Sequence, residues 1–141
     1  MAYGCNMNGS EMKKRCPNAI RLGVSMIQDY ELRFHYHANI EFSVGKSVPV
    51  IVWELQKSDE ISLDGYEGYP QSYTKKDFCV DFDGGSIKAM AYIMTDYKIN
   101  QQRGCPPADE YFNNIKTGYL DARIDLGPLN QALRSVSQIS G

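Results

Sequence analysis

Apolar residues alternate with other residues along much of the first half of the chain, which is the period of a β-strand with one buried face. The alternation covers residues 19–26 and residues 30–36. Residues 48–55 form a nearly continuous apolar run with Pro49 near its start, where a strand tolerates proline. We therefore predict three strands here, preceded by a very short strand at residues 1–5. The alternating apolar residues of the first segment are Ile20, Leu22, Val24 and Met26.

A β-hairpin is predicted for residues 73–95. Phe78, Val80 and Phe82 would share one face of its first strand. The second strand is expected from residue 87 onward, with alternate small and branched apolar residues on one face. Between the two strands lies Asp83-Gly84-Gly85, a sequence that favours the tight turns of hairpins because Asp and Gly tolerate positive φ angles.

Helices are predicted from capping residues and stop residues. Ser10 and Ser58 are candidate N-caps for helices over residues 11–15 and 59–66, and Gly68 is expected to end the second of these. Two further helices are predicted over residues 108–116 and 128–136, each entered at a proline, with a loop over residues 100–107. Strands in the middle and helices at the end indicate a single α+β domain spanning residues 1–141, built on a mostly antiparallel or mixed sheet.

Composition and charge narrow the class of protein. The formal net charge is −2 and no basic stripe is present, which argues against a nucleic-acid partner. No apolar run is long enough to cross a bilayer, so no membrane partner is expected. Four cysteines lie far apart without a C-x-x-C pair, and we expect no secretory leader. Reduced thiols and a cytoplasmic location fit these observations. The sequence leaves open whether copies of the chain form a homo-oligomer.

Two segments carry residues suited to chemistry. Tyr3-Gly4-Cys5-Asn6 ends a predicted strand, and a glycine followed by small or polar residues lets backbone N–H groups converge on an oxyanion. The other reading of this segment is an ordinary strand end. Glu67 lies among tyrosines and glycines at a predicted helix end, where partial desolvation would raise its pKa toward neutrality. The other reading of Glu67 is a solvated surface residue.

His35, His37 and Cys5 suggest two other kinds of chemistry. On one strand the two histidines would face the same way, which is compatible with a metal ion, but no third ligand occurs at a recognisable spacing. Cys5 could act as a nucleophile beside a histidine, or it could be a small buried thiol. We expect no metal site, and Tyr92 and Tyr111 are read from the pattern alone as core or wall residues.

Four blocks in order along the chain carry a family resemblance. Tyr3-Gly4-Cys5-Asn6-Met7 comes first and is followed by Arg15-Cys16-Pro17 and residues 29–34. Leu63-Asp64-Gly65-Tyr66-Glu67-Gly68, residues 91–97 and residues 106–111 complete the set. The ordered set resembles the gamma-glutamylcyclotransferase family, in which the motifs Tyr-Gly-Ser-Asn-Leu, Leu-Asp-x-x-Glu-Gly, Tyr-Leu-Met-Thr-Asn-Tyr and Pro-Pro-Ser-x-x-Tyr occur in the same order. Two departures are Cys5, where the family has Ser, and the helix after Pro128, which lacks the family's usual Tyr.

The resemblance implies a small mixed β-barrel surrounded by helices, with a site at one end. It implies an enzyme of glutathione metabolism that releases 5-oxoproline from a small-molecule gamma-glutamyl substrate without a cofactor or metal. Glu67 would be the general acid/base. The residues implied to bind substrate are Tyr3, Gly4, Cys5, Asn6, Tyr92 and Tyr111. Two alternatives remain: a non-catalytic binding module on the same fold, and a Cys5-dependent hydrolase or acyltransferase.

Overall fold

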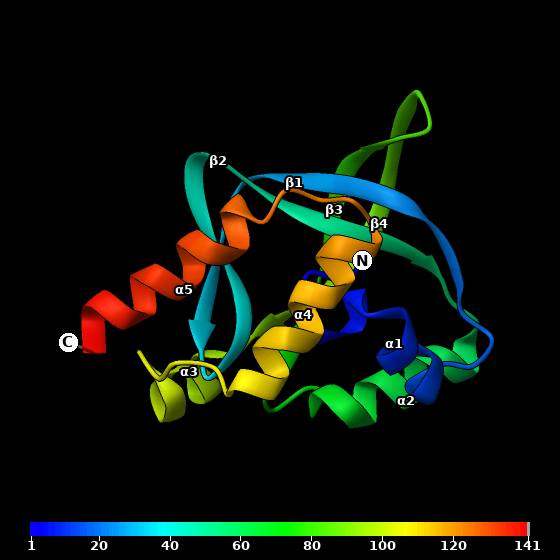
Figure 1. The fold of residues 1–141 in the computed structure, drawn as a ribbon. Helices are drawn as coiled ribbons and strands as arrows, with labels where there is room; N and C mark the ends of the chain where they lie inside the picture. The colour runs from blue at the N-terminus through cyan, green and yellow to red at the C-terminus, as the bar shows by residue number, and fades with distance from the viewer. Residues whose placement is uncertain (141) are drawn as a thin grey trace.

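The computed structural model describes the backbone of residues 1–140 and the side chains of residues 1–136. Its strands form two antiparallel hairpins (Figure 1). The first pairs β1 (Ile20–His35) with β2 (His37–Glu54), and the second pairs β3 (Tyr73–Phe82) with β4 (Gly85–Met94). Helices pack around these hairpins, so the predicted α+β class is confirmed.

The strands of the first hairpin are longer and more continuous than the separate strand segments predicted for this part of the chain. The segments 19–26 and 30–36 belong to one strand, because Asp29 adopts a φ of 64° at a shift in the β1–β2 register instead of ending the strand. This irregularity changes which residues face the core. Ser25 and Ile27 are buried before it, whereas Leu32 and Phe34 are buried after it.

The apolar alternation at the start of β1 marks the outer face of the strand. Ile20, Leu22 and Val24 are 56%, 46% and 40% exposed. The side chains that face inward in this stretch include Ser25, whose hydroxyl donates a hydrogen bond to the Asp81 carbonyl oxygen at 2.5 Å. Alternation therefore indicated the strand correctly but did not identify its buried side, because packing against β3 decided that.

The second hairpin agrees closely with its prediction. β3 has the predicted bounds, and β4 ends at Met94, one residue earlier than expected, because Thr95 caps the next helix. Asp83 and Gly84 have φ angles of 51° and 78°, as a tight two-residue hairpin turn requires.

The N-terminal segment and the first two helices depart from prediction in detail. Ala2 pairs with Ile51, but the expected strand at residues 1–5 gives way to a 3-10 turn, η1 (Cys5–Met7). Helix α1 (Gly9–Arg15) is capped by Asn8 rather than Ser10: the Asn8 side chain accepts from the N–H groups of Ser10 and Glu11. An amide two residues upstream reaches these donors, whereas Ser10 lies inside the helix.

Helix α2 (Lys57–Glu67) begins earlier than predicted. Its N-cap is Gln56, whose backbone N–H donates to the Asp59 carboxylate at 2.9 Å, so Ser58 is inside the helix. The predicted stop is confirmed, because Gly68 takes the left-handed conformation with a φ of 70°. That conformation is easy for glycine and places Glu67 at the last position of the helix.

Three helices complete the described chain. Helix α3 (Asp96–Gln102) was not predicted and occupies part of the expected loop at residues 100–107; the Thr95 hydroxyl caps it by accepting from the Lys98 N–H. Helix α4 (Asp109–Asp121) continues beyond the predicted end at residue 116. Helix α5 (Gly127–Ser140) contains the predicted segment 128–136.

Among the described residues, the larger of two hydrophobic clusters lies between the two hairpins and under α4 and α5. It contains buried residues from both hairpins, among them Ile27, Val50, Phe78 and Ala91. Strand pairing within residues 1–140 is limited to the two hairpins and the Ala2–Ile51 bridge, so closure into a hydrogen-bonded barrel stays a prediction. Figure 1 shows α4 crossing beside the N-terminal segment, with α1 and α2 close together below it. Within the described part of the chain, no helix has the length and apolar character needed to span a membrane.

Candidate functional site

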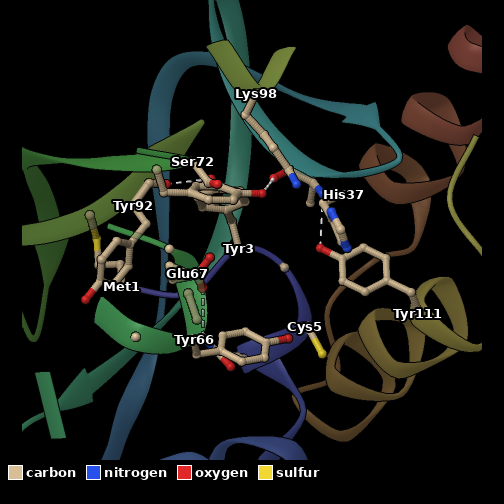
Figure 2. Close-up of a pocket in the computed structure, with 17 residues that line it drawn as sticks. Met1, Tyr3, Cys5, His37, Tyr66, Glu67, Ser72, Tyr92, Lys98 and Tyr111 are labelled. Atoms are coloured by element: carbon tan, nitrogen blue, oxygen red, sulfur yellow. Dashed lines mark hydrogen bonds between the residues drawn. The ribbon is translucent and has the colours of Figure 1, made fainter. Parts of the chain in front are cut away.

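A cavity of about 290 Å³ opens where the N-terminal segment meets the end of α2 (Figure 2). Its walls also include residues from the start of β2 and from β3, β4, α3 and α4. All seven site residues expected from the sequence line this cavity: Tyr3, Gly4, Cys5, Asn6, Glu67, Tyr92 and Tyr111. They come from four separate parts of the chain, and the fold brings them together.

The N-terminal wall is a strand end that turns abruptly into η1. The turn's backbone hydrogen bonds use the N–H groups of Met7 and Asn8, which donate to the carbonyls of Gly4 and Cys5 at 3.0 and 3.1 Å. The N–H groups of Cys5 and Asn6 donate none of the backbone hydrogen bonds that form this turn. Trp53 reinforces the turn, because its indole N–H donates to the Asn6 carbonyl oxygen at 3.2 Å.

Gly4 is constrained by its neighbours. A Cβ atom at this position would lie 3.3 Å from the Ala38 Cβ and 3.5 Å from the Tyr111 hydroxyl oxygen. The first of these distances is shorter than ordinary van der Waals contact. A glycine here therefore lets the N-terminal segment approach both β2 and α4.

Glu67 is half-buried at the C-terminal end of α2 and points into the cavity. Burial raises the pKa of its carboxyl group to about 7, and the Arg15 guanidinium acts in the opposite direction. The Asn6 side-chain amide donates a hydrogen bond to Glu67 Oε1 at 3.4 Å. A carboxyl group with a pKa near neutrality can exist in both protonation states under ordinary conditions.

Tyrosine hydroxyls surround the carboxyl group and are held by the backbone. Tyr3 donates to the Tyr92 carbonyl oxygen at 2.5 Å, and Tyr73 donates to the Ala38 carbonyl oxygen at 2.8 Å. The Tyr111 hydroxyl accepts from the Ala38 N–H at 3.0 Å. Burial raises the pKa of Tyr3, Tyr73 and Tyr111 well above their usual range, so these side chains are neutral polar groups with fixed orientations.

Tyr92 also connects β4 to α2. Its hydroxyl donates to Asp64 Oδ1 at 2.5 Å, and Asp64 also pairs with Lys75 at 3.0 Å. Because Asp64 lies less than one helical turn before Glu67, this network ties the end of α2 to the second hairpin. Asp64 is therefore a structural contact of the site.

The two histidines do not form the pair that the sequence suggested. Tyr36, with a φ of 61°, makes the turn between β1 and β2, so His35 and His37 lie on different strands. His35 Nε2 lies 2.7 Å from Glu41, whereas His37 lines the cavity against the Tyr111 ring. Among the described residues, no group of three or more His, Cys, Asp or Glu side chains is arranged to hold a metal ion.

Cys5 is a buried thiol at the edge of the cavity. Burial raises the pKa of this thiol, while the nearby Arg15 charge acts in the opposite direction. A thiol with a raised pKa is a weak nucleophile, because the thiolate is the reactive form.

Sequence reasoning missed several residues around the site. Arg15 was not among the expected site residues, yet its side chain is only 15% exposed and reaches Asn6. Tyr73 and Lys98 line the cavity from β3 and α3 and have no distinctive local pattern. For Arg15 the one usable indication was its place in a block that resembles the family.

Comparison with known proteins defines the class. Residues 1–113 match the family model described as "Gamma-glutamyl cyclotransferase, AIG2-like". The chain is 31% identical to the gamma-glutamylcyclotransferase of Mus musculus, in an alignment that covers 83% of this chain and 67% of the mouse protein. The Homo sapiens gamma-glutamylcyclotransferase matches with the same identity and coverage.

A solved structure supports the same family assignment. A structure named "Gamma-glutamyl cyclotransferase" superposes with a TM-score of 0.78 at 27% identity, covering 93% of this chain and 83% of that one. The chain belongs to the gamma-glutamyl cyclotransferase, AIG2-like family.

Proposed function

We propose that this protein is a gamma-glutamylcyclotransferase, which releases 5-oxoproline and a free amine from a gamma-glutamyl peptide or gamma-glutamyl amine. The observation that carries the proposal is Glu67, a half-buried carboxyl group in the cavity whose pKa is raised to about 7. Membership of the family and the names of the relatives support the reaction class. A cytoplasmic location and a part in glutathione metabolism belong to the same proposal.

The reaction is an internal aminolysis. In its free-base form, the α-amine of the substrate attacks the γ-carbonyl carbon, and a new C–N bond closes a five-membered lactam. The bond between the γ-carbon and the leaving nitrogen then breaks. The attacking nitrogen loses a proton and the leaving nitrogen gains one, so one group that accepts and returns a proton balances the reaction.

Glu67 is proposed to carry that proton. As a carboxylate it accepts the proton from the attacking amine, and as a carboxylic acid it returns the proton to the leaving nitrogen. A pKa of about 7 makes both steps accessible near neutral pH, whereas an ordinary glutamate would be a weak base there. The substrate supplies its own nucleophile, so Cys5 needs no covalent role.

The other wall residues would hold the substrate in a curled shape. Intramolecular geometry of this kind can contribute up to ~7–11 kcal/mol to lowering a barrier. The N–H groups of Cys5 and Asn6, which η1 does not use for its own hydrogen bonds, are the candidate donors to the oxyanion. Tyr3, Tyr92 and Tyr111 supply neutral, fixed surfaces against which the gamma-glutamyl group would lie.

The test is Glu67→Gln assayed by 5-oxoproline release. The amide is nearly the same size but cannot accept and return a proton, so turnover should fall at least about 100-fold, the lower end of what general acid–base catalysis contributes. The variant should still bind substrate, and its melting temperature should be no lower than that of wild type. A variant that keeps more than about a tenth of wild-type turnover would refute the assignment.

The matched control is Glu54→Gln, the same chemical change at an exposed position at the end of β2. It should leave turnover unchanged. Asp64→Asn is unsuitable as a control, because Asp64 accepts from Tyr92 and pairs with Lys75. A folded wild-type protein that binds a gamma-glutamyl dipeptide but never forms 5-oxoproline would be the binding module instead.

A further inference from the structure

We propose that Arg15 is the positioning residue of this site: its guanidinium sets the orientation of Asn6 and Tyr66, so that the Asn6 amide N–H is presented to Glu67. The inference concerns how the acid/base is held, and its catalytic meaning rests on the proposed function. Arg15 does not line the cavity, so it would act through the residues it touches.

The guanidinium of Arg15 contacts three parts of the chain. It extends from the last residue of α1, and its Nη1 donates to Asn6 Oδ1 at 3.1 Å. Its carbon Cζ lies 3.6 Å from the centre of the Tyr66 ring, a stacked cation–π contact with the residue beside Glu67. Its Nη2 lies 3.4 Å from Glu11 Oε2 and 3.9 Å from Cys5 Sγ. One planar group thus joins α1, η1 and the end of α2.

The contact with Asn6 decides which end of that amide faces Glu67. A guanidinium has only donors, so the Asn6 side chain turns its oxygen toward Arg15. Its NH₂ group is then left on the side of Glu67 and donates to Oε1 at 3.4 Å. In this orientation Asn6 stabilises the carboxylate form of Glu67 and holds the carboxyl group in one place.

Arg15 is also the charged neighbour that opposes burial at Glu67. The tyrosines that face Glu67 from the N-terminal segment, β3, β4, α4 and α2 itself are neutral, because burial raises their pKa values. They are Tyr3, Tyr73, Tyr92, Tyr111 and Tyr66. Glu11 faces Arg15 from the same helix and partly offsets its charge. The other titratable groups on the cavity wall are Cys5, His37, Lys98 and the amino group of Met1.

The experiment measures the Glu67 carboxyl titration by carbon NMR, with its resonance identified by its loss in Glu67→Gln. The proteins are wild type, Arg15→Met, Arg15→Lys and Glu11→Gln, each also assayed for kcat/KM across pH. Lys13→Met is the matched control, because it removes an exposed charge from the same helix. Thermal melts report which variants fold.

Three responses are expected. In Arg15→Met the titration midpoint of Glu67 moves to higher pH, and kcat/KM at its optimum falls by up to about 100-fold through misplacement of the carboxyl group. In Arg15→Lys the midpoint stays near that of wild type but the rate loss remains, because an ammonium cannot both stack on Tyr66 and hold Asn6 as a planar fork does. In Glu11→Gln the midpoint moves to lower pH. Lys13→Met changes neither quantity.

An unchanged Glu67 midpoint in Arg15→Met and Glu11→Gln, with wild-type kcat/KM, would overturn the inference. If Arg15→Met fails to fold, Arg15→Lys and Glu11→Gln still test the inference. A wild-type kcat/KM in Arg15→Lys together with an unchanged Glu67 midpoint in Glu11→Gln would refute it. If the wild type releases no 5-oxoproline, the proposed function fails, yet the titrations still show whether Arg15 acts on Glu67. If the wild type turns over, and the Glu67 midpoint and kcat/KM stay at their wild-type values in Arg15→Met and Glu11→Gln, only the role of Arg15 fails.

Discussion

Glu67 is the last residue of a helix, it lines the cavity, and the pKa of its carboxyl group is raised. Its backbone ends α2, and Gly68 then turns the chain away, which leaves the side chain directed into the cavity. The peptide carbonyls at a helix C-terminus carry partial negative charge, so this position also disfavours a carboxylate. The location that suits proton transfer therefore costs stability whenever the carboxyl group is ionised.

This cost predicts how stability depends on pH. The pKa of Glu67 is about 7 in the folded protein against a usual value of 4.5, so the folded state binds more protons than the unfolded state between these values. Stability from this group is therefore fully present below about pH 4.5 and is lost as pH rises through 7. Glu67→Gln should be more stable than wild type at pH 8, by up to about 3 kcal/mol.

The measurement is denaturant unfolding of both proteins between pH 4 and pH 8, with Glu54→Gln in parallel. The stability gap between wild type and Glu67→Gln should narrow as pH falls, whereas Glu54→Gln should follow wild type throughout. A gap that does not change with pH would show that the Glu67 carboxyl group is not desolvated.

Cys5 gives a second prediction at the scale of one residue. The Cys5 thiol is buried and its pKa is raised. In the proposed mechanism Cys5 acts through its backbone N–H and not through its thiol. Cys5→Ser should therefore keep 5-oxoproline release within about tenfold of wild type, since it alters only the weak side-chain hydrogen bonds of the thiol with Arg15 and Tyr66. A folded Cys5→Ser that loses activity by about a thousandfold would favour a nucleophilic cysteine instead.

At the scale of elements, helix α4 supports the turn that carries Cys5 and Asn6. Gly118 lets α4 and η1 approach each other closely. A Cβ atom at this position would lie 2.7 Å from the Met7 carbonyl carbon and 2.8 Å from the Met7 Cβ. Real Cβ atoms do not come so near to a backbone, so one of the two elements would have to move. The same helix contributes Tyr111 to the cavity wall.

Gly118→Ala should accordingly lower both stability and turnover. Overpacking at such a contact typically costs about 1–3 kcal/mol, and a displaced η1 would shift Asn6 relative to Glu67. The matched control for stability is Gly65→Ala in α2, where an added Cβ meets nothing within 4 Å and should raise stability by up to about 1 kcal/mol. Thermal melts of both variants test this, and an equally stable Gly118→Ala would contradict the packing argument.

At the scale of the whole molecule, the cavity exists because distant segments converge. Tyr3 lies in the N-terminal segment, Glu67 ends a central helix, and Tyr111 belongs to a helix over a hundred residues beyond Tyr3. Under the proposed mechanism these walls would hold the substrate in a curled shape, and no side chain of the protein would attack it. The nucleophile must then come from the substrate.

A substrate comparison tests that conclusion. A gamma-glutamyl dipeptide with a free α-amine should yield 5-oxoproline, whereas its N-acetyl derivative should bind without turning over, because the lone pair of an acetylated nitrogen is delocalised into the acetyl carbonyl and is a poor nucleophile. The readout is amine release together with 5-oxoproline. Amine released from the N-acetyl compound would indicate ordinary hydrolysis and exclude the cyclisation mechanism.

Most of the elements could be predicted from the sequence because their causes are local. The hairpin β3–β4 follows from alternation around an Asp-Gly turn, and the end of α2 follows from Gly68. The ordered motifs identified seven of the residues that line the cavity, including Glu67, although their roles stay proposals. Helix α3 was missed because its polar sequence gives no strong periodic pattern.

Only the tertiary structure decided which faces are buried and which charges meet. The outward orientation of Ile20, Leu22 and Val24 depends on how β1 packs against β3, and alternation is the same for either orientation. The raised pKa of Glu67 and the reach of Arg15 to Asn6 and Tyr66 depend on burial and on contacts between elements distant in sequence. Periodicity and capping act over a few residues, whereas desolvation and Coulomb interactions depend on distance in space, which the chain acquires only when it folds.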